Sequence, residues 1–249
     1  MKKLLTLLLC AALLCPVLAL ADAAPRMTPE MDALKTANEA LMSRYGLTLP
    51  ALGLFDAQVD LCGETAIVTY RGNAVSEALT GTYYVIIAPH GVQPMWTHDG
   101  SLVPWQSGEL KSPVWGMPQL QTYLNTSSYA RHDAFSPYFP DDLSSLADFL
   151  AAGGSYHDVT SANRGAADSA QALAKQAVVS MFGLTEDEAA LLAVNAGDTR
   201  LVRYPDNHGE WETMVHLEDG SAAETCFWVV IHAETGLILN VVVSSGGVG

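Results

Sequence analysis

Two segments of this chain repeat each other, and the repeat restricts the folds that are open to it. Ala37–Thr48 matches Ala174–Thr185 at six of twelve positions. Further along, Tyr83–Ile87 corresponds to Phe227–Ile231, and a glycine follows each block within a few residues. Because two matches in the same order are hard to obtain by chance, we interpret the chain as two copies of one module.

Each module is predicted to begin with a helix. In the first, apolar residues lie at helical spacing from Met31 to Tyr45, Thr28 is placed as the N-cap and Gly46 as the C-terminal stop. In the second, the apolar stripe spans 170–181 and ends at Gly183. Thr185 and Glu188 then form the pattern of a capping box that starts a short helix over 186–193.

Runs of β-forming residues follow each helix. The predicted strands are 65–70 and 82–88 in the first module, and 200–204, 211–217, 226–233 and 237–244 in the second. Residues 82–88 are continuously apolar, which predicts a strand that is buried on both faces. One helix that covers one face of a small antiparallel sheet is an α+β layer, so the predicted class is α+β.

The boundaries follow from these elements and from changes in composition. We expect a signal peptide over 1–23, a first module over 28–98, a connector over 99–163, a second module over 164–244 and a loose tail over 245–249. The connector is rich in Pro, Gly and aromatic residues and contains a predicted helix over 141–150. Aromatic residues here favour an ordered connector that packs over the modules, with Trp96, Trp105 and Trp115 as a candidate partner surface.

The N-terminus has the pattern of an export signal. Lys2 and Lys3 precede an apolar run that ends in two Ala-x-Ala sites, so cleavage is expected after Ala21 or Ala23. The expected location is therefore secreted and extracellular, with the cell envelope as an alternative, and membrane contact is expected only through this segment before cleavage.

Charge and cysteine content exclude some classes of function. The formal net charge is −15, and no cluster of Lys and Arg exists that would bind nucleic acid. After cleavage only Cys62 and Cys226 remain, which is too few for a disulfide framework. A single disulfide between them is one alternative, and two separate buried thiols in apolar strands are the other.

The closing segment of the second module carries a family resemblance. Phe227–Leu239, an aromatic strand that runs into an Ala-Glu-Thr-Gly turn, resembles the last hairpin of the PepSY module, with His232 at a position where the family has an acidic residue. The first copy departs further, with Ala88–Gly91 at the turn. The connector is similar to that of two-module secreted proteins of clostridia-like Gram-positive bacteria. The resemblance implies a non-enzymatic module, found in the propeptides of secreted metallopeptidases and in envelope proteins.

A search for catalytic and metal motifs gives no site. The spacing of the seven histidines matches no zinc motif. His208, Glu210 and His216 could gather, but strand alternation places His216 with Glu212 and Met214 on a face expected to be solvent-exposed. No nucleophile motif or phosphate loop occurs. We therefore predict no catalytic, cofactor-binding or metal-binding residues.

Three hypotheses about the function remain open at this point. The first is a secreted binding or regulatory protein whose partner is a protein or peptide, such as a secreted peptidase, taken at a strand edge or at the aromatic connector. The alternative is an extracellular hydrolase that uses carboxylates or a histidine cluster between the modules. The third reading is a spacer without a ligand.

Overall fold

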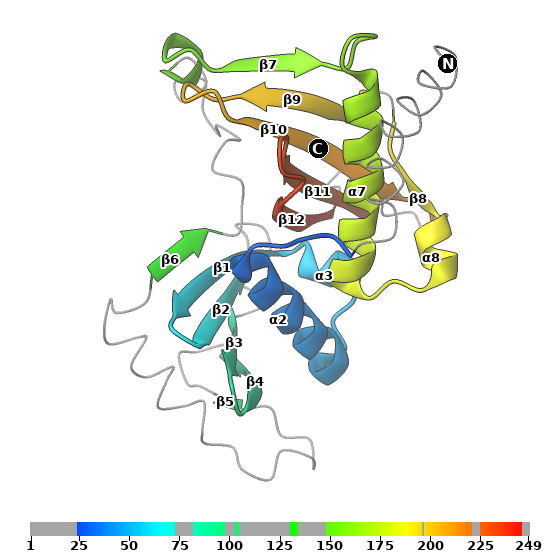
Figure 1. Ribbon diagram of the computed structural model, residues 1–249. Coiled ribbons are helices and arrows are strands. Elements are labelled where there is room, and N and C mark those ends of the chain that lie inside the picture. Colours follow the sequence, from blue (N-terminus) through cyan, green and yellow to red (C-terminus); the bar gives the residue numbers. More distant parts are fainter. Residues whose placement is uncertain are drawn as a thin grey trace, which may run out of the picture.

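The computed structural model describes residues 24–72, 82–97, 103–104, 130–133, 148–195, 197–220 and 225–245. The predicted signal peptide, the sequence 246–249 of the tail, Trp105 and Trp115 lie outside these ranges. Within them the chain combines helices with two antiparallel sheets, which confirms the α+β class (Figure 1).

The first half consists of a long helix, a short helix and most of one sheet. The elements are α2 (Pro29–Tyr45), α3 (Leu49–Leu52), β1 (Phe55–Cys62), β2 (Thr65–Gly72), β3 (Thr82–Ala88), β4 (Gly91–Thr97), β5 (Val103–Pro104) and β6 (Ala130–Asp133). The strand order in this sheet is β5-β4-β3-β2-β1-β6, and every neighbouring pair is antiparallel. α2 contacts β1 to β4.

The second half has the other sheet and its own long helix. The elements are β7 (Ser155–Asp158), α7 (Arg164–Phe182), α8 (Glu186–Ala190), β8 (Leu192–Ala193), β9 (Thr199–Arg203), β10 (Gly209–Leu217), β11 (Thr225–His232) and β12 (Ile238–Ser245). The sheet order is β12-β11-β10-β9-β7, and β8 pairs with β10. Figure 1 shows α7 crossing one face of this sheet.

The helix ends follow the predicted local chemistry. Thr28 Oγ1 accepts a hydrogen bond from Met31 N at 3.3 Å, and Pro29 occupies the first turn of α2. Gly46 and Gly183 end the two long helices with φ of 67° and 63°, where a side chain would be strained. Thr185 and Glu188 form the predicted capping box of α8, but the helix ends at Ala190 and not at 193, because Leu192–Ala193 pairs with β10 as β8.

The strand predictions were less complete. β1 and the strands β4 to β8 were not predicted. β3 is less buried than expected: only Val85 and Ile86 are buried, and its other residues are half-buried. Described residues of the predicted connector add β5 and β6 to the first sheet and β7 to the second. Of the predicted connector helix, the structure describes 148–151 as helical, with Gly153 in a left-handed turn after it.

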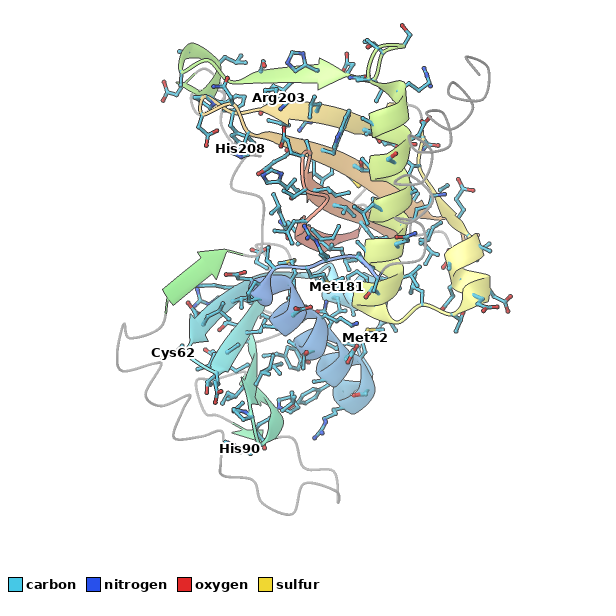
Figure 2. The ribbon with its side chains drawn as sticks, in the orientation of Figure 1. Met42, Cys62, His90, Met181, Arg203 and His208 are labelled. Carbon is cyan, nitrogen blue, oxygen red and sulfur yellow. The ribbon has the colours of Figure 1, made fainter. Side chains whose placement is uncertain are left out.

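The two halves share one continuous core. Helix α2 contacts both α7 and β12, and Figure 2 shows Met42 and Met181 on the adjoining ends of the two long helices. Ile238 N donates to Arg26 O at 2.8 Å, and Thr28 N donates to Ile238 O at 3.3 Å. The segment that leads into α2 therefore pairs with the start of the last strand, which fixes the halves relative to each other.

Candidate functional site

A groove lies between α7 and the β11–β12 turn. It has a volume of about 390 Å³. The helix contributes Ala166, Ser169, Ala170, Ala172, Leu173 and Gln176, and the sheet contributes Trp211, Ile231 and residues 232–236. Such a concave site next to an ordered helix is the usual place to look for a ligand.

The floor of the groove is formed by apolar residues, and the small residues of the helix leave space above the sheet. Ala170, Trp211 and Ile231 are buried and belong to the side of the groove nearest the core. Gly236 has a φ of 66°, and a Cβ at this position would lie 3.4 Å from Leu173 Cδ2. A larger residue at the turn would therefore both strain the backbone and narrow the groove.

The rim of the groove is polar and carries opposite charges. Glu234 Oε1 accepts a hydrogen bond from Arg203 Nη1 at 2.7 Å, and Glu234 Oε2 lies 3.2 Å from His232 Nδ1. The hydrogen bond from Arg203 lowers the pKa of Glu234, which therefore stays ionised. The side chains of Glu234 and Arg203 are 48 % and 40 % exposed, so this pair is available to a ligand and adds little stability.

A second cluster adjoins this rim at the β9–β10 turn. His208 lies between Asp206, at 2.5 Å from Nδ1, and Glu210, at 3.3 Å from Nε2, and its ring stacks on Tyr204 at 4.1 Å. Figure 2 shows His208 and Arg203 at the same end of the sheet. The His208 and His232 rings are 6.2 Å apart, which links the cluster to the groove.

Charge partners control the protonation of His208. Burial would lower its pKa, but the hydrogen bonds and charges of Asp206 and Glu210 outweigh burial and raise it. Tyr204 Oη also donates to Glu210 Oε2 at 2.8 Å. The cluster thus holds a histidine that gains a proton readily beside the groove.

His216, on the face of the second sheet that points away from α7, is less exposed than predicted. Its neighbour Glu212 is fully buried and bonds to Arg200 Nε at 2.6 Å. Burial raises the pKa of Glu212, and the charge and hydrogen bond of Arg200 oppose the rise. His216 has a side chain that is only 13 % exposed. Alternation identified the correct face but not how far its residues are buried.

The other residues singled out from the sequence are separated in space. Cys62 is exposed on β1, Cys226 is buried on β11, and they are not bonded to each other (Figure 2 labels Cys62). The structure therefore does not contain the disulfide, because the two cysteines lie in different sheets. Trp96 lies on β4, in the first sheet, so it is not part of the groove.

Of the histidine set considered for a metal, only part comes together. His208 and Glu210 are in contact, whereas His216 lies six residues further along β10. Among the residues that the structure describes, no group of three or more His, Cys, Asp and Glu side chains is arranged to hold a metal ion. The sequence analysis did not predict that the β9–β10 and β11–β12 turns lie next to each other. The strand register brings these turns together, because it places Glu210 opposite His232.

Comparison with known proteins gives no relative. No family model, no curated protein and no solved structure matches this chain. No helix within the described ranges is long and apolar enough to cross a membrane.

Proposed function

We propose that this chain is a secreted, non-catalytic binding or regulatory protein built from two PepSY-like modules. Supporting the duplication, α2 and α7 both end in aromatic-Gly-Leu-Thr with the glycine in the left-handed region. Each of these helices also lies on an antiparallel sheet. The export-signal pattern at 1–23 supports secretion.

The groove beside α7 is the observation that carries the binding function. Its volume of about 390 Å³ falls in the lower part of the range of ligand pockets, about 300–1,000 Å³. The apolar floor suits an apolar anchor side chain of a ligand. The charged rim suits the backbone and the neighbouring polar residues of the same ligand. The groove therefore suits a segment of polypeptide better than a polar metabolite.

The partner that fits this surface is an extended segment with an apolar anchor residue and a flanking Lys or Arg. The chain carries a formal net charge of −15, and the half-exposed Glu234 offers an acidic contact at the rim. A secreted peptidase or another envelope protein would present such a segment. Edge strand β7 is the weaker docking site, because it has only four residues and ends in exposed His157 and Asp158.

The hydrolase alternative has less support from the described residues. The acid and histidine cluster lies at the β9–β10 and β11–β12 turns of the second sheet, not between the halves where that hypothesis places it. The hypothesis of a spacer without a ligand does not account for an apolar groove beside a charged rim.

Filling the groove tests the proposal. Ala166 is exposed on α7 and lines the groove, so Ala166→Trp should occupy it without disturbing the core. We expect peptides selected from a displayed random library on the wild-type protein to contain an apolar residue next to Lys or Arg. Their affinity for Ala166→Trp, measured by fluorescence anisotropy, should fall at least tenfold.

The matched control is Ala190→Trp, an exposed alanine on α8 outside the groove, which should bind like the wild type. Selected peptides that bind equally to both variants would contradict the proposal, as would a library that yields no binders. Peptides that pass this test identify the partner segment, and the matching secreted protein is then assayed for peptidase activity with and without this protein.

A further inference from the structure

Cys226, His216 and Asp198 form a continuous chain of contacts on the face of the second sheet that points away from α7. Cys226 Sγ lies 3.3 Å from His216 Nδ1, and His216 Nε2 lies 2.8 Å from Asp198 Oδ2. These contacts connect a nucleophile, a base and a carboxylate that orients the base. This is the arrangement that activates cysteine nucleophiles.

The backbone holds all three residues in place. His216 on β10 is the direct cross-strand partner of Cys226 on β11, so their side chains leave the sheet on the same face. Asp198 lies just before β9, where its carbonyl accepts a hydrogen bond from Met214 N at 2.9 Å. Asn195 N donates to Asp198 Oδ2 at 3.0 Å, which fixes the carboxylate that faces His216.

Both ring nitrogens of His216 face groups that can accept a proton. A protonated imidazole can donate from Nε2 to the Asp198 carboxylate and from Nδ1 to a Cys226 thiolate. Other charged or titratable side chains on this face of the described sheet lie further from Cys226. Glu212 pairs with Arg200 of β9, and Glu210, in contact with His208, lies opposite His232 of β11. Strand β8, which pairs with β10, and strand β12, which pairs with β11, contain no titratable residue.

We propose that Cys226, His216 and Asp198 form an activated-thiol site that exchanges with small disulfides. His216 takes the thiol proton, and the Cys226 thiolate attacks one sulfur of the small disulfide. The S–S bond of the small disulfide breaks, and its second sulfur leaves as a thiolate that accepts the proton from His216. Cys226 is oxidised to a mixed disulfide, and the small disulfide is reduced to one thiol.

Exposure of the three residues decreases from the carboxylate to the thiol. The side chains of Asp198 and His216 are 26 % and 13 % exposed, and Cys226 is 8 % exposed. A small disulfide is therefore the class of substrate that suits the site, and the binding groove on the opposite side of the sheet, beside α7, is not involved. Asp198 acts here as a positioning residue, because it contacts the base and not the thiol.

Peptide-resolved mass spectrometry tests the proposal on the whole protein with oxidised glutathione as the probe. At pH 6.5 an ordinary thiol is only about 1 % thiolate. Complete conversion of Cys226 to the thiolate would therefore raise its reaction rate by up to about 100-fold. We expect Cys226 to react at least tenfold faster in the wild type than in His216→Gln. The rate should fall several-fold in Asp198→Asn. The exposed Cys62 serves as an internal reference in every sample.

The pH profile separates activation from a structural role. In the wild type the Cys226 rate should change little between pH 6 and pH 8, whereas in both variants it should rise with pH as for an ordinary thiol. If His216→Gln unfolds the chain, Asp198→Asn and the wild-type profile still decide. A Cys226 that does not react in the native protein, or that follows an ordinary thiol profile in the wild type, overturns the proposal.

Discussion

Glu212 is a fully buried carboxylate, and a neighbouring residue of the second sheet partly compensates its charge. Arg200 supplies the opposite charge at 2.6 Å while its guanidinium lies 4.8 Å from the Tyr156 ring centre. Burial of the charge costs free energy that one partly exposed arginine offsets only in part, so the pKa of Glu212 stays raised. Glu212 is therefore held on this face by a specific charged partner.

His208 should make the stability of the protein depend on pH. Its pKa in the folded chain is raised above the ordinary value of 6.5. A group with a raised folded pKa stabilises the fold fully below its unfolded pKa, and this contribution is lost as pH rises through the folded pKa. Urea unfolding should therefore show that His208→Gln loses stability relative to the wild type at pH 6 and loses less at pH 8.

Asp206→Asn is the control for this pH dependence, because Asp206 makes the largest contribution that raises the pKa of His208. In this variant, NMR titration should give a lower His208 pKa than in the wild type. An equal loss of stability in His208→Gln at both pH values would contradict the assigned role of the histidine.

Local capping decides where the short helix α8 begins. Glu188 N donates to Thr185 Oγ1 at 3.3 Å, and Thr185 N donates to Glu188 Oε2 at 2.8 Å. α8 has no buried residue, so its packing provides little support and the cap matters more. Helices α2 and α7, in contrast, are held by a buried apolar stripe.

Replacing the cap should weaken this element measurably. We expect Thr185→Ala to lower the free energy of unfolding by about 1 kcal/mol, the usual value for an N-cap hydroxyl. Denaturant unfolding measures the change, and Thr185→Ser, which keeps the hydroxyl, should retain most of the stability. A full loss in the serine variant would show that the methyl group, and not the cap, is responsible.

The described residues of the two halves form one packed body because they share a core. Phe182, at the end of α7, is buried, and its ring lies 5.1 Å from that of Phe227 on β11. It also borders a small cavity that is lined by α2, α3 and β1 residues of the first half. Phe182 thus contacts the second sheet and lines a cavity with residues that the repeat would assign to the first module.

Removing this side chain should destabilise both halves together. We expect Phe182→Ala to lower the free energy of unfolding by about 3–5 kcal/mol, as for other buried aromatic residues. Hydrogen exchange should then speed up for the slowest amides of both sheets. Leu191→Ala, at a residue that is 41 % exposed, is the control and should change little. First-sheet amides that keep their protection in Phe182→Ala would show that the halves unfold separately.

The sequence by itself determined the elements whose signals are local. Helix starts and stops at Thr28, Gly46, Gly183 and Thr185 could be predicted, because capping and left-handed glycines act within a few residues. Strand alternation also identified the two faces of β10. The α+β class followed from these elements.

Only the tertiary structure decided what each face meets. His216 gains Asp198 and Cys226 as neighbours through strand pairing between residues 10 and 18 positions apart. The groove arises because small residues of α7 lie opposite a turn more than fifty residues later in the chain. Such contacts depend on register and on how helices lie on sheets, and local patterns in the sequence carry no information about either.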